Sequence, residues 1–192
     1  MHSQYDEEQI IIDRFGLARV GVYVDIGAGG PIDQSNTYAC YQRGWRGLAV
    51  EPQANMVAEF RRVRPLDTVL HAALAPYDGG CQIVRDGGWA ALRFLHPNEK
   101  VAQECNCLTP ASLLARFPQF VAPDLACIDI EGAEAVIVPM FDWQAFRPQM
   151  LIVEHDAADI THDSRPLWEF ALLPRYDRFH ANAGNSFYWR RP

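Results

Sequence analysis

The chain has 192 residues, the length of one ordinary domain, and its hydrophobic content of 49% is enough to build a core. A net charge of -7 leaves no basic surface with which to neutralise phosphates, so the composition argues against nucleic acid as a partner. We therefore expect a single domain over residues 1–192.

Residues 1–8 are polar and acidic, whereas a secretory signal needs a basic start followed by an apolar stretch. No segment is long and apolar enough to cross a bilayer. Five cysteines at irregular spacing are typical of reduced thiols rather than of a disulfide framework. We expect a cytoplasmic protein without a membrane partner.

The first half of the chain alternates between helical and strand patterns. Glu7–Phe15 predicts a short amphipathic helix that stops at Gly16, within an N-terminal helical segment of residues 1–20. The elements expected next are a buried strand over 21–26, a helix capped by Ser35 or Asn36 and running to about 43, a strand over 47–50, a helix with apolar residues between 56 and 63, a strand over 68–74 and a short strand over 81–85.

The second half begins with a break in periodicity between residues 86 and 106, which we interpret as a substrate-facing excursion. Thr109 and Pro110 then predict a helix start. The elements expected after it are a buried strand over 125–130, a helix over 133–140 that ends or bends at Pro139, a strand over 150–153, a helix near 167–171 and a hairpin of 176–181 with 186–190. Strands that alternate with helices in this way predict an open α/β sheet.

Glycines and acidic residues directly follow several predicted strands, and ligands bind beyond the carboxyl ends of parallel strands. Glycines allow a ligand to approach the backbone, and an acid after the second strand can accept hydrogen bonds from ribose hydroxyls. The residues concerned are Asp25, Gly27, Ala28 and Gly29 after the first strand, Glu51 after the second, Asp129 after the fourth, and Glu154 with His155 after the fifth.

This pattern indicates a nucleoside-containing cofactor without a diphosphate. The dinucleotide fingerprint is incomplete, because Ile32 stands where its third glycine would be and Pro31 interrupts the loop. Asp25 also adds negative charge beside the loop. These features suit S-adenosylmethionine, which carries a positive sulfonium and no phosphate.

Four stretches resemble the FkbM-type methyltransferases, a family of S-adenosylmethionine-dependent class I enzymes. They are Gly21-Val22-Tyr23-Val24-Asp25-Ile26-Gly27-Ala28, Ser35-Asn36-Thr37, Gly44-Trp45-Arg46-Gly47-Leu48-Ala49-Val50-Glu51-Pro52 and Ile128-Asp129-Ile130-Glu131-Gly132-Ala133-Glu134. The opening Ser3-Gln4 with Asp6-Glu7 is similar to family members too, so the resemblance covers nearly the whole chain.

The resemblance implies a Rossmann-like fold with a mostly parallel seven-stranded sheet, helices on both faces and a C-terminal β-hairpin. It also implies O-methylation of a hydroxyl on a small-molecule or glycan acceptor, such as a sugar or natural product. Asn36 and Thr37 are either a helix cap alone or a cap that also contacts the cofactor. The positions that the resemblance assigns to cofactor binding are Asp25, Gly27, Ala28, Gly29, Asn36, Thr37, Glu51, Pro52, Ala72, Ala73 and Asp129.

Methyl transfer to a hydroxyl requires in-line alignment and a route for the proton. The candidate catalytic residues are Asp129, Glu131, Glu154 and His155. Glu131 and Glu134 could instead serve only to stabilise a helix N-terminus. If the enzyme uses Mg2+, the oxygens of Asp129, Glu154 and Asp156 would hold it.

Two other functions compete with this one. A nucleotide-dependent oxidoreductase shares the sheet and the ribose-binding acid, but the chain lacks the third glycine and a Tyr-x-x-x-Lys pair. A non-catalytic, methyltransferase-like binding module would keep the cofactor pocket without turnover. Because only residues 86–106 are available to cover the site, we expect either an open pocket or a second subunit of a homo-oligomer to complete it.

Overall fold

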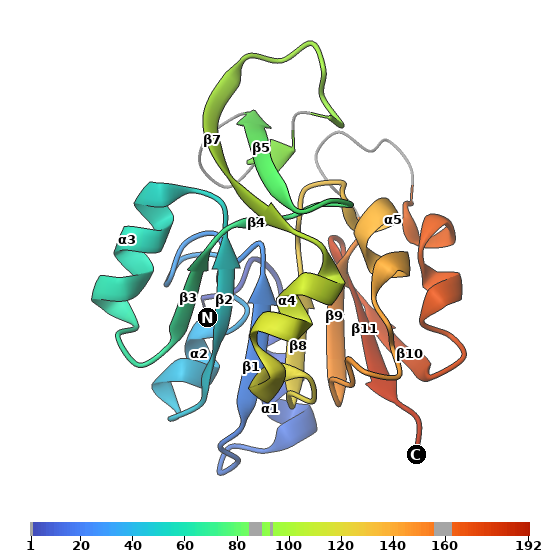
Figure 1. Cartoon of the computed structure of the whole chain (residues 1–192). Coiled ribbons are helices and arrows are strands. Elements are labelled where there is room, and N and C mark those ends of the chain that lie inside the picture. The colour runs from blue at the N-terminus through green and yellow to red at the C-terminus, as the bar shows by residue number, and fades with distance from the viewer. Residues whose placement is uncertain (1, 85–89, 93, 156–162) are drawn as a thin grey trace.

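The computed structural model describes residues 2–84, 90–92, 94–155 and 163–192. Its main feature is a seven-stranded sheet (Figure 1). In spatial order the strands are β10 (Tyr176–Ala181), β11 (Asn185–Arg190), β9 (Met150–Glu154), β8 (Leu125–Ile128), β1 (Val22–Ile26), β2 (Arg46–Glu51) and β3 (Thr68–His71). β9, β8, β1, β2 and β3 are parallel, whereas β11 is antiparallel to both β9 and β10. The predicted mostly parallel sheet with its C-terminal hairpin is confirmed.

Helices cover both faces of this sheet, as predicted. Their bounds are α1 (Glu7–Phe15), α2 (Tyr38–Gln42), α3 (Ala54–Val63), α4 (Pro110–Arg116) and α5 (Glu134–Ile137), with 3-10 turns η1 (Pro118–Phe120), η2 (Val138–Met140), η3 (Arg165–Leu167) and η4 (Glu169–Ala171). Ile11 of α1 and Cys40 of α2 pack against Tyr23 on one face, while Leu113 of α4 and Ile137 of α5 join the core on the other. The central strands are therefore buried on both sides, as their continuous apolar runs require.

A second sheet stands beyond the carboxyl ends of the parallel strands (Figure 1). Its order is β4 (Ala73–Leu74), β7 (Val101–Leu108), β5 (Gly79–Val84) and β6 (Ala91–Leu92). The single strand predicted over 68–74 is thus divided between the two sheets, because the Ala72 amide donates to the Glu51 carbonyl before the chain turns away to β7. The segment 86–106, which was interpreted as a substrate-facing excursion, includes the first part of β7 from Val101 onward.

Two predicted helix starts have different outcomes. Thr109 caps α4 through a hydrogen bond that its side chain accepts from the Ser112 amide, which confirms the helix start at Thr109 and Pro110. The start at Ser35 or Asn36 is wrong, because α2 begins only at Tyr38. The Ser35 hydroxyl instead accepts a hydrogen bond from the backbone N–H of Thr37.

The region after β9 also differs from its prediction. The helix expected near 167–171 is replaced by the 3-10 turns η3 and η4. Pro166 lies in η3 and lacks a backbone N–H, which disfavours a continuous α-helix there. Within the described residues, no helix has the length and apolar character needed to cross a bilayer.

Candidate functional site

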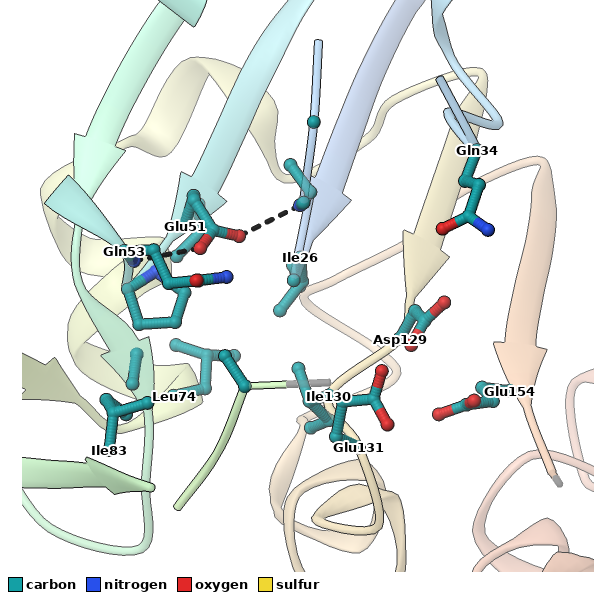
Figure 2. A pocket seen from close by; sticks show the side chains of 18 of the residues that line it. Ile26, Gln34, Glu51, Gln53, Leu74, Ile83, Asp129, Ile130, Glu131 and Glu154 are labelled. Atoms are coloured by element: carbon teal, nitrogen blue, oxygen red, sulfur yellow. Dashed lines mark hydrogen bonds between the residues drawn. The ribbon is translucent and has the colours of Figure 1, made fainter. Parts of the chain in front are cut away.

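A cavity of about 340 Å³ lies at the carboxyl ends of the parallel strands. Its walls come from the turn after β1, the end of β2, the start of the small sheet, the loop after β8 and the end of β9. Figure 2 shows Glu51 on one side of the cavity and Asp129 with Glu154 on the other. Both the size and the position at the strand ends are typical of a small-ligand site in an α/β sheet.

The turn after β1 places two glycines, whose backbone carries no side chain, at the cavity wall. Gly27 has φ +76, and a Cβ there would lie 1.6 Å from the carbonyl oxygen of Asp129. Gly29 has φ +57, and the space around its missing Cβ is open to 4 Å. Glycine is therefore required sterically at the first position and conformationally favoured at the second. Gly27, Ala28 and Gly29 all line the cavity.

Glu51 is held in place by two backbone amides. Its Oε2 accepts a hydrogen bond from the Gly29 amide at 2.8 Å, and its Oε1 accepts one from the Gln53 amide at 2.8 Å. Burial raises the pKa of Glu51 to about 7. An ionised carboxylate offers about four acceptor sites, so Glu51 keeps acceptor capacity for a ligand. The structure thus joins this acid to the glycine turn.

An apolar slot adjoins Glu51. Pro52, Ala72 and Ala73 line the cavity, as do Leu74 and the small-sheet residues Ile83, Ala90 and Leu92. Ala90 and Leu92 fall within the predicted excursion 86–106, so part of that segment does reach the cavity. Residues 85–89 and 93 lie outside the described residues.

Acidic side chains dominate the opposite wall. Asp129, Glu131 and Glu154 all line the cavity. Burial, together with the negative charges of Asp129 and Glu134, raises the pKa of Glu154 to about 12, and burial raises the pKa of Asp129 to about 6. The arrangement therefore keeps a proton in the Asp129–Glu154 pair at neutral pH, because two buried carboxylates this close together disfavour being ionised at the same time. Glu131 adopts φ +55, an unfavourable conformation that tends to occur at functional sites.

Carboxylate oxygens of Asp129, Glu134 and Glu154 lie within 4.8 Å of one another, and hard oxygen ligands are the kind that Mg2+ prefers. Glu134 was not among the predicted metal ligands. Its two oxygens accept hydrogen bonds from the amides of Ile130 and Gly132, which places the carboxylate beside the other two. Asp156, the third predicted ligand, lies outside the described residues.

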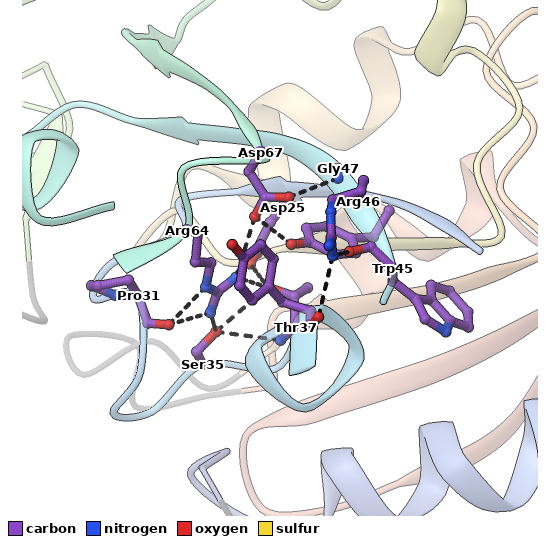
Figure 3. A network of polar contacts seen from close by, with 11 residues as sticks. Asp25, Pro31, Ser35, Thr37, Trp45, Arg46, Gly47, Arg64 and Asp67 are labelled. Atoms are coloured by element: carbon purple, nitrogen blue, oxygen red, sulfur yellow. Dashed lines mark hydrogen bonds and ion pairs between the residues drawn. The ribbon is translucent and has the colours of Figure 1, made fainter. Parts of the chain in front are cut away.

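The prediction that Asp25 contacts the cofactor differs from the structure. Asp25 does not line the cavity, and its Oδ2 accepts a hydrogen bond from the Thr37 hydroxyl at 2.5 Å. Side chains of a strand alternate between the two faces, and Ile26 rather than Asp25 faces the cavity. Figure 3 shows Asp25 within a polar network that includes Thr37 and Arg64. Thr37 and Asn36 likewise do not line the cavity.

His155 also lies away from the cavity walls, although it follows Glu154 directly. Its ring Nδ1 is 3.1 Å from the Ser186 hydroxyl, and its backbone amide donates to the Gly184 carbonyl. Since neighbouring residues of an extended chain point in opposite directions, only one of the pair can face the ligand. The structure therefore does not support His155 as a base that touches the ligand.

Sequence reasoning missed a group of cavity residues from the two ends of the chain. They are Gln4, Tyr5, Gly184 and Asn185. The hairpin 176–190 was recognised, but no ligand contact was assigned to its turn. The antiparallel register that places Asn185 opposite Glu154 is the signal that could have found it.

The chain resembles one known protein family in sequence. A family model described as the methyltransferase FkbM domain matches residues 25–178. No curated protein matches the chain in sequence.

Solved structures share the fold at low sequence identity. A TehB-like SAM-dependent methyltransferase from Corynebacterium glutamicum is 8% identical, with a TM-score of 0.52, over 98% of this chain and 89% of that one. A precorrin-6Y C5,15-methyltransferase from Geobacter metallireducens is 13% identical, with a TM-score of 0.52, over 96% of this chain and 87% of that one.

Proposed function

The chain belongs to the FkbM family of methyltransferases, and from this we propose that it transfers a methyl group from S-adenosylmethionine to a hydroxyl group of a sugar or natural product. The observation that carries the proposal is the position of Glu51, fixed at 2.8 Å from the Gly29 amide on the wall of the cavity. A glycine turn joined to an acid at the end of β2 suits a ribose without a diphosphate.

The cavity fits the cofactor in its shape and in its chemistry. Glu51 would accept hydrogen bonds from the ribose hydroxyls, and the apolar slot beside Ala72 and Leu74 would take the adenine ring. The open space beside Gly29 allows the ligand to approach the backbone. The acidic wall that includes Asp129 suits a cationic group. When bound, S-adenosylmethionine supplies an electrophilic methyl group on a positively charged sulfur.

The acidic wall would orient the acceptor and receive its proton. Asp129 is the proposed base, because its pKa of about 6 leaves the carboxylate ionised at neutral pH. Glu154 holds a proton in the same range and would instead hydrogen-bond the acceptor. Glu131 lines the cavity between β8 and α5, where it would contact the acceptor.

A metal-assisted form of the same reaction would use Asp129, Glu134 and Glu154 to hold Mg2+ and lower the pKa of the acceptor hydroxyl. In that form the three carboxylates would hold the cation, and its positive charge would compensate their negative charges. Methylation assays with EDTA and with added Mg2+ separate the two forms. Activity that survives EDTA rules out the metal-assisted form, and loss of that activity in Asp129→Asn would then assign the base to Asp129.

Calorimetric titration with S-adenosylmethionine, S-adenosylhomocysteine and NAD in parallel tests the cofactor assignment. We expect the first two to bind and NAD not to bind. Glu51→Ala should weaken binding by about tenfold or more, because two ribose hydrogen bonds are lost. Glu59→Ala, a change on α3 away from the cavity walls, should leave binding unchanged. Binding of NAD alone would establish the oxidoreductase instead.

The acceptor assignment needs a separate assay with S-adenosylmethionine labelled in its methyl group. We expect label to appear as a methyl ether on a sugar or natural-product hydroxyl. Label found only on nitrogen or carbon would rule out O-methylation. Tight cofactor binding without transfer to any acceptor class would identify a non-catalytic binding module.

A further inference from the structure

Two buried oxygen atoms in the cavity wall have no hydrogen-bond partner in the described structure. They are Oε2 of Glu154 and Oδ1 of Asn185. Both residues line the cavity, and they are only 8% and 4% exposed. An unsatisfied buried acceptor is energetically unfavourable, so a pair of them at a cavity wall points to a missing hydrogen-bond donor.

The two residues are neighbours because of strand register. Asn185 of β11 is paired with Glu154 of β9. Side chains of directly opposed residues in an antiparallel pair project on the same face, about 5 Å apart. Their free oxygens therefore belong to one small region of the wall.

A buried carboxylate fixes the orientation of Asn185. The Nδ2 atom of Asn185 donates to Oε1 of Glu7 at 2.9 Å, and Glu7 is fully buried. The Asn182 side chain donates to the same oxygen at 2.7 Å, and the Tyr5 amide donates to the other carboxylate oxygen at 2.9 Å. Because its amide nitrogen is committed to Glu7, Asn185 can offer a ligand only its carbonyl oxygen.

The other acceptor is fixed in a comparable way. Glu154 is hydrogen-bonded through its side chain to Asp129, and its Oε2 remains without a partner. Figure 2 shows the Glu154 carboxylate directed toward Asp129 and Glu131, on the side of the cavity opposite Glu51. The cofactor-binding features lie around Glu51, so the Glu154 side is left for the acceptor.

Tyr5 adds an aromatic surface beside these oxygens. It lines the cavity and packs so closely on Gly184 that a Cβ there would lie 2.9 Å from the tyrosine ring. An aromatic face next to hydrogen-bond acceptors suits a ligand with one apolar side and one hydroxyl-bearing side. A sugar ring has this combination.

We infer that Glu154 and Asn185 form a subsite for two neighbouring hydroxyl groups of the acceptor, which is a neutral sugar or sugar-bearing compound. The inference rests on the proposed function, because it assumes that the cofactor fills the Glu51 side. Two acceptors without a donor favour a ligand that donates twice, as a vicinal diol does. They also disfavour phosphate and carboxylate groups, which would meet only oxygen lone pairs and negative charge.

The test uses the full chain saturated with S-adenosylhomocysteine and measures sugar binding by saturation-transfer NMR and calorimetry. The probes are the methyl glycosides of rhamnose, glucose and galactose, with glucose 1-phosphate as the anionic comparison. We expect at least one methyl glycoside to bind and glucose 1-phosphate not to bind. Asn185→Leu should weaken the binding by about tenfold while the affinity for S-adenosylhomocysteine stays the same.

Asn182→Ala is the control for the support of the turn, because it removes the amide donor to Glu7 and the oxygen that accepts from the Gly184 and Asn185 amides, but no cavity-lining side chain. It should weaken sugar binding by no more than about threefold, less than Asn185→Leu does. Equal losses in the Asn182 and Asn185 variants would show that only the support of the turn matters, and would overturn the subsite.

A second experiment uses the unaltered chain, so its result does not depend on whether a variant folds. Deoxy analogues of the bound glycoside should show two adjacent hydroxyls whose removal each weakens binding by about tenfold. The inference is wrong if no glycoside binds the protein saturated with S-adenosylhomocysteine, or if no hydroxyl pair stands out. Failure of S-adenosylhomocysteine itself to bind would refute the proposed function instead.

Discussion

Arg64 donates a hydrogen bond from its Nη1 atom to the Thr37 hydroxyl at 2.8 Å, and that hydroxyl in turn donates to Asp25. The same guanidinium reaches the Pro31 carbonyl through Nε at 2.8 Å. A single buried cation therefore ties α3 to the turn after β1 and to the acid of β1 (Figure 3). Asp25 is thereby linked to the turn after β1, and it does not line the cavity.

Replacing Arg64 should lower the free energy of unfolding of the whole chain. Arg64→Met would leave the buried Asp67 carboxylate without its ion-pair partner and the Pro31 carbonyl without its donor. Breaking a buried pair is unfavourable by about 3–5 kcal/mol. Urea denaturation should show a loss of this order. Arg62→Ala, an exposed position of the same helix, should change stability by less than about 0.5 kcal/mol. Similar losses for both variants would contradict the role assigned to Arg64.

Alanine substitutions at Gly27 and Gly29, two glycines of the turn after β1, should change stability by different amounts. Gly27→Ala should lower stability by about 2–4 kcal/mol, because the new Cβ would collide with the Asp129 backbone. Gly29→Ala meets no atom within 4 Å and should lower stability only by about 1 kcal/mol, the result of its positive φ. Urea denaturation of the two variants measures the difference. Equal values would mean that the turn rearranges freely around Gly27.

The main sheet and the place of the ligand could be predicted from the sequence, because both depend on local patterns. Continuous apolar runs identified the parallel strands, and the rule that ligands bind at their carboxyl ends located Glu51 and Asp129. The side on which Asp25 points was not predictable in the same way, because the apolar run of β1 does not indicate which of two neighbouring residues faces the cavity.

Strand β7 and the cavity wall formed by the two ends of the chain were missed because their sequence signals are weak. Residues 101–108 alternate between more and less buried positions, but with few β-branched or aromatic residues among them. The side-chain amide of Asn185 is oriented by Glu7, 178 residues away in the chain, which accepts a hydrogen bond from it. Contacts between the two ends of a chain leave no periodic signal in either.

The buried carboxyl groups should make the fold less stable as the pH rises. Asp129 and Glu134 have pKa values raised to about 6 and 7, and Glu154 to about 12, so the folded chain binds protons more tightly than the unfolded chain does. Their contribution is fully present below about pH 4 and is lost as the pH rises through these values. Urea denaturation between pH 5 and pH 8 should show a falling free energy of unfolding.

Glu154→Gln tests the same linkage at one position. Glutamine keeps a hydrogen-bond donor toward Asp129 without having to take up a proton, so the variant should be more stable at pH 7.5 by on the order of 2 kcal/mol. The advantage should shrink toward pH 4.5, where the unfolded chain is itself half protonated. Glu59→Gln on the surface should show no such trend. A gain independent of pH would argue against a proton on Glu154.

Binding of S-adenosylhomocysteine should depend on pH through Glu51. A ribose hydroxyl donates to a carboxylate, and burial raises the pKa of Glu51 to about 7, so the binding-competent ionised form increases as the pH rises through neutrality. The apparent affinity is reduced by the fraction that is protonated, which predicts a gain of about tenfold between pH 6 and pH 8.

Calorimetry across this range, repeated with Glu51→Gln, isolates the contribution of Glu51. The variant should bind more weakly at pH 8 and show a nearly flat profile, because its amide does not titrate. Asp25 and Asp129 are unchanged in it, so any slope that they cause would persist. An equal slope in the original chain and the variant would show that those acids, and not Glu51, cause the pH dependence of binding. It would contradict the ribose contact assigned to Glu51.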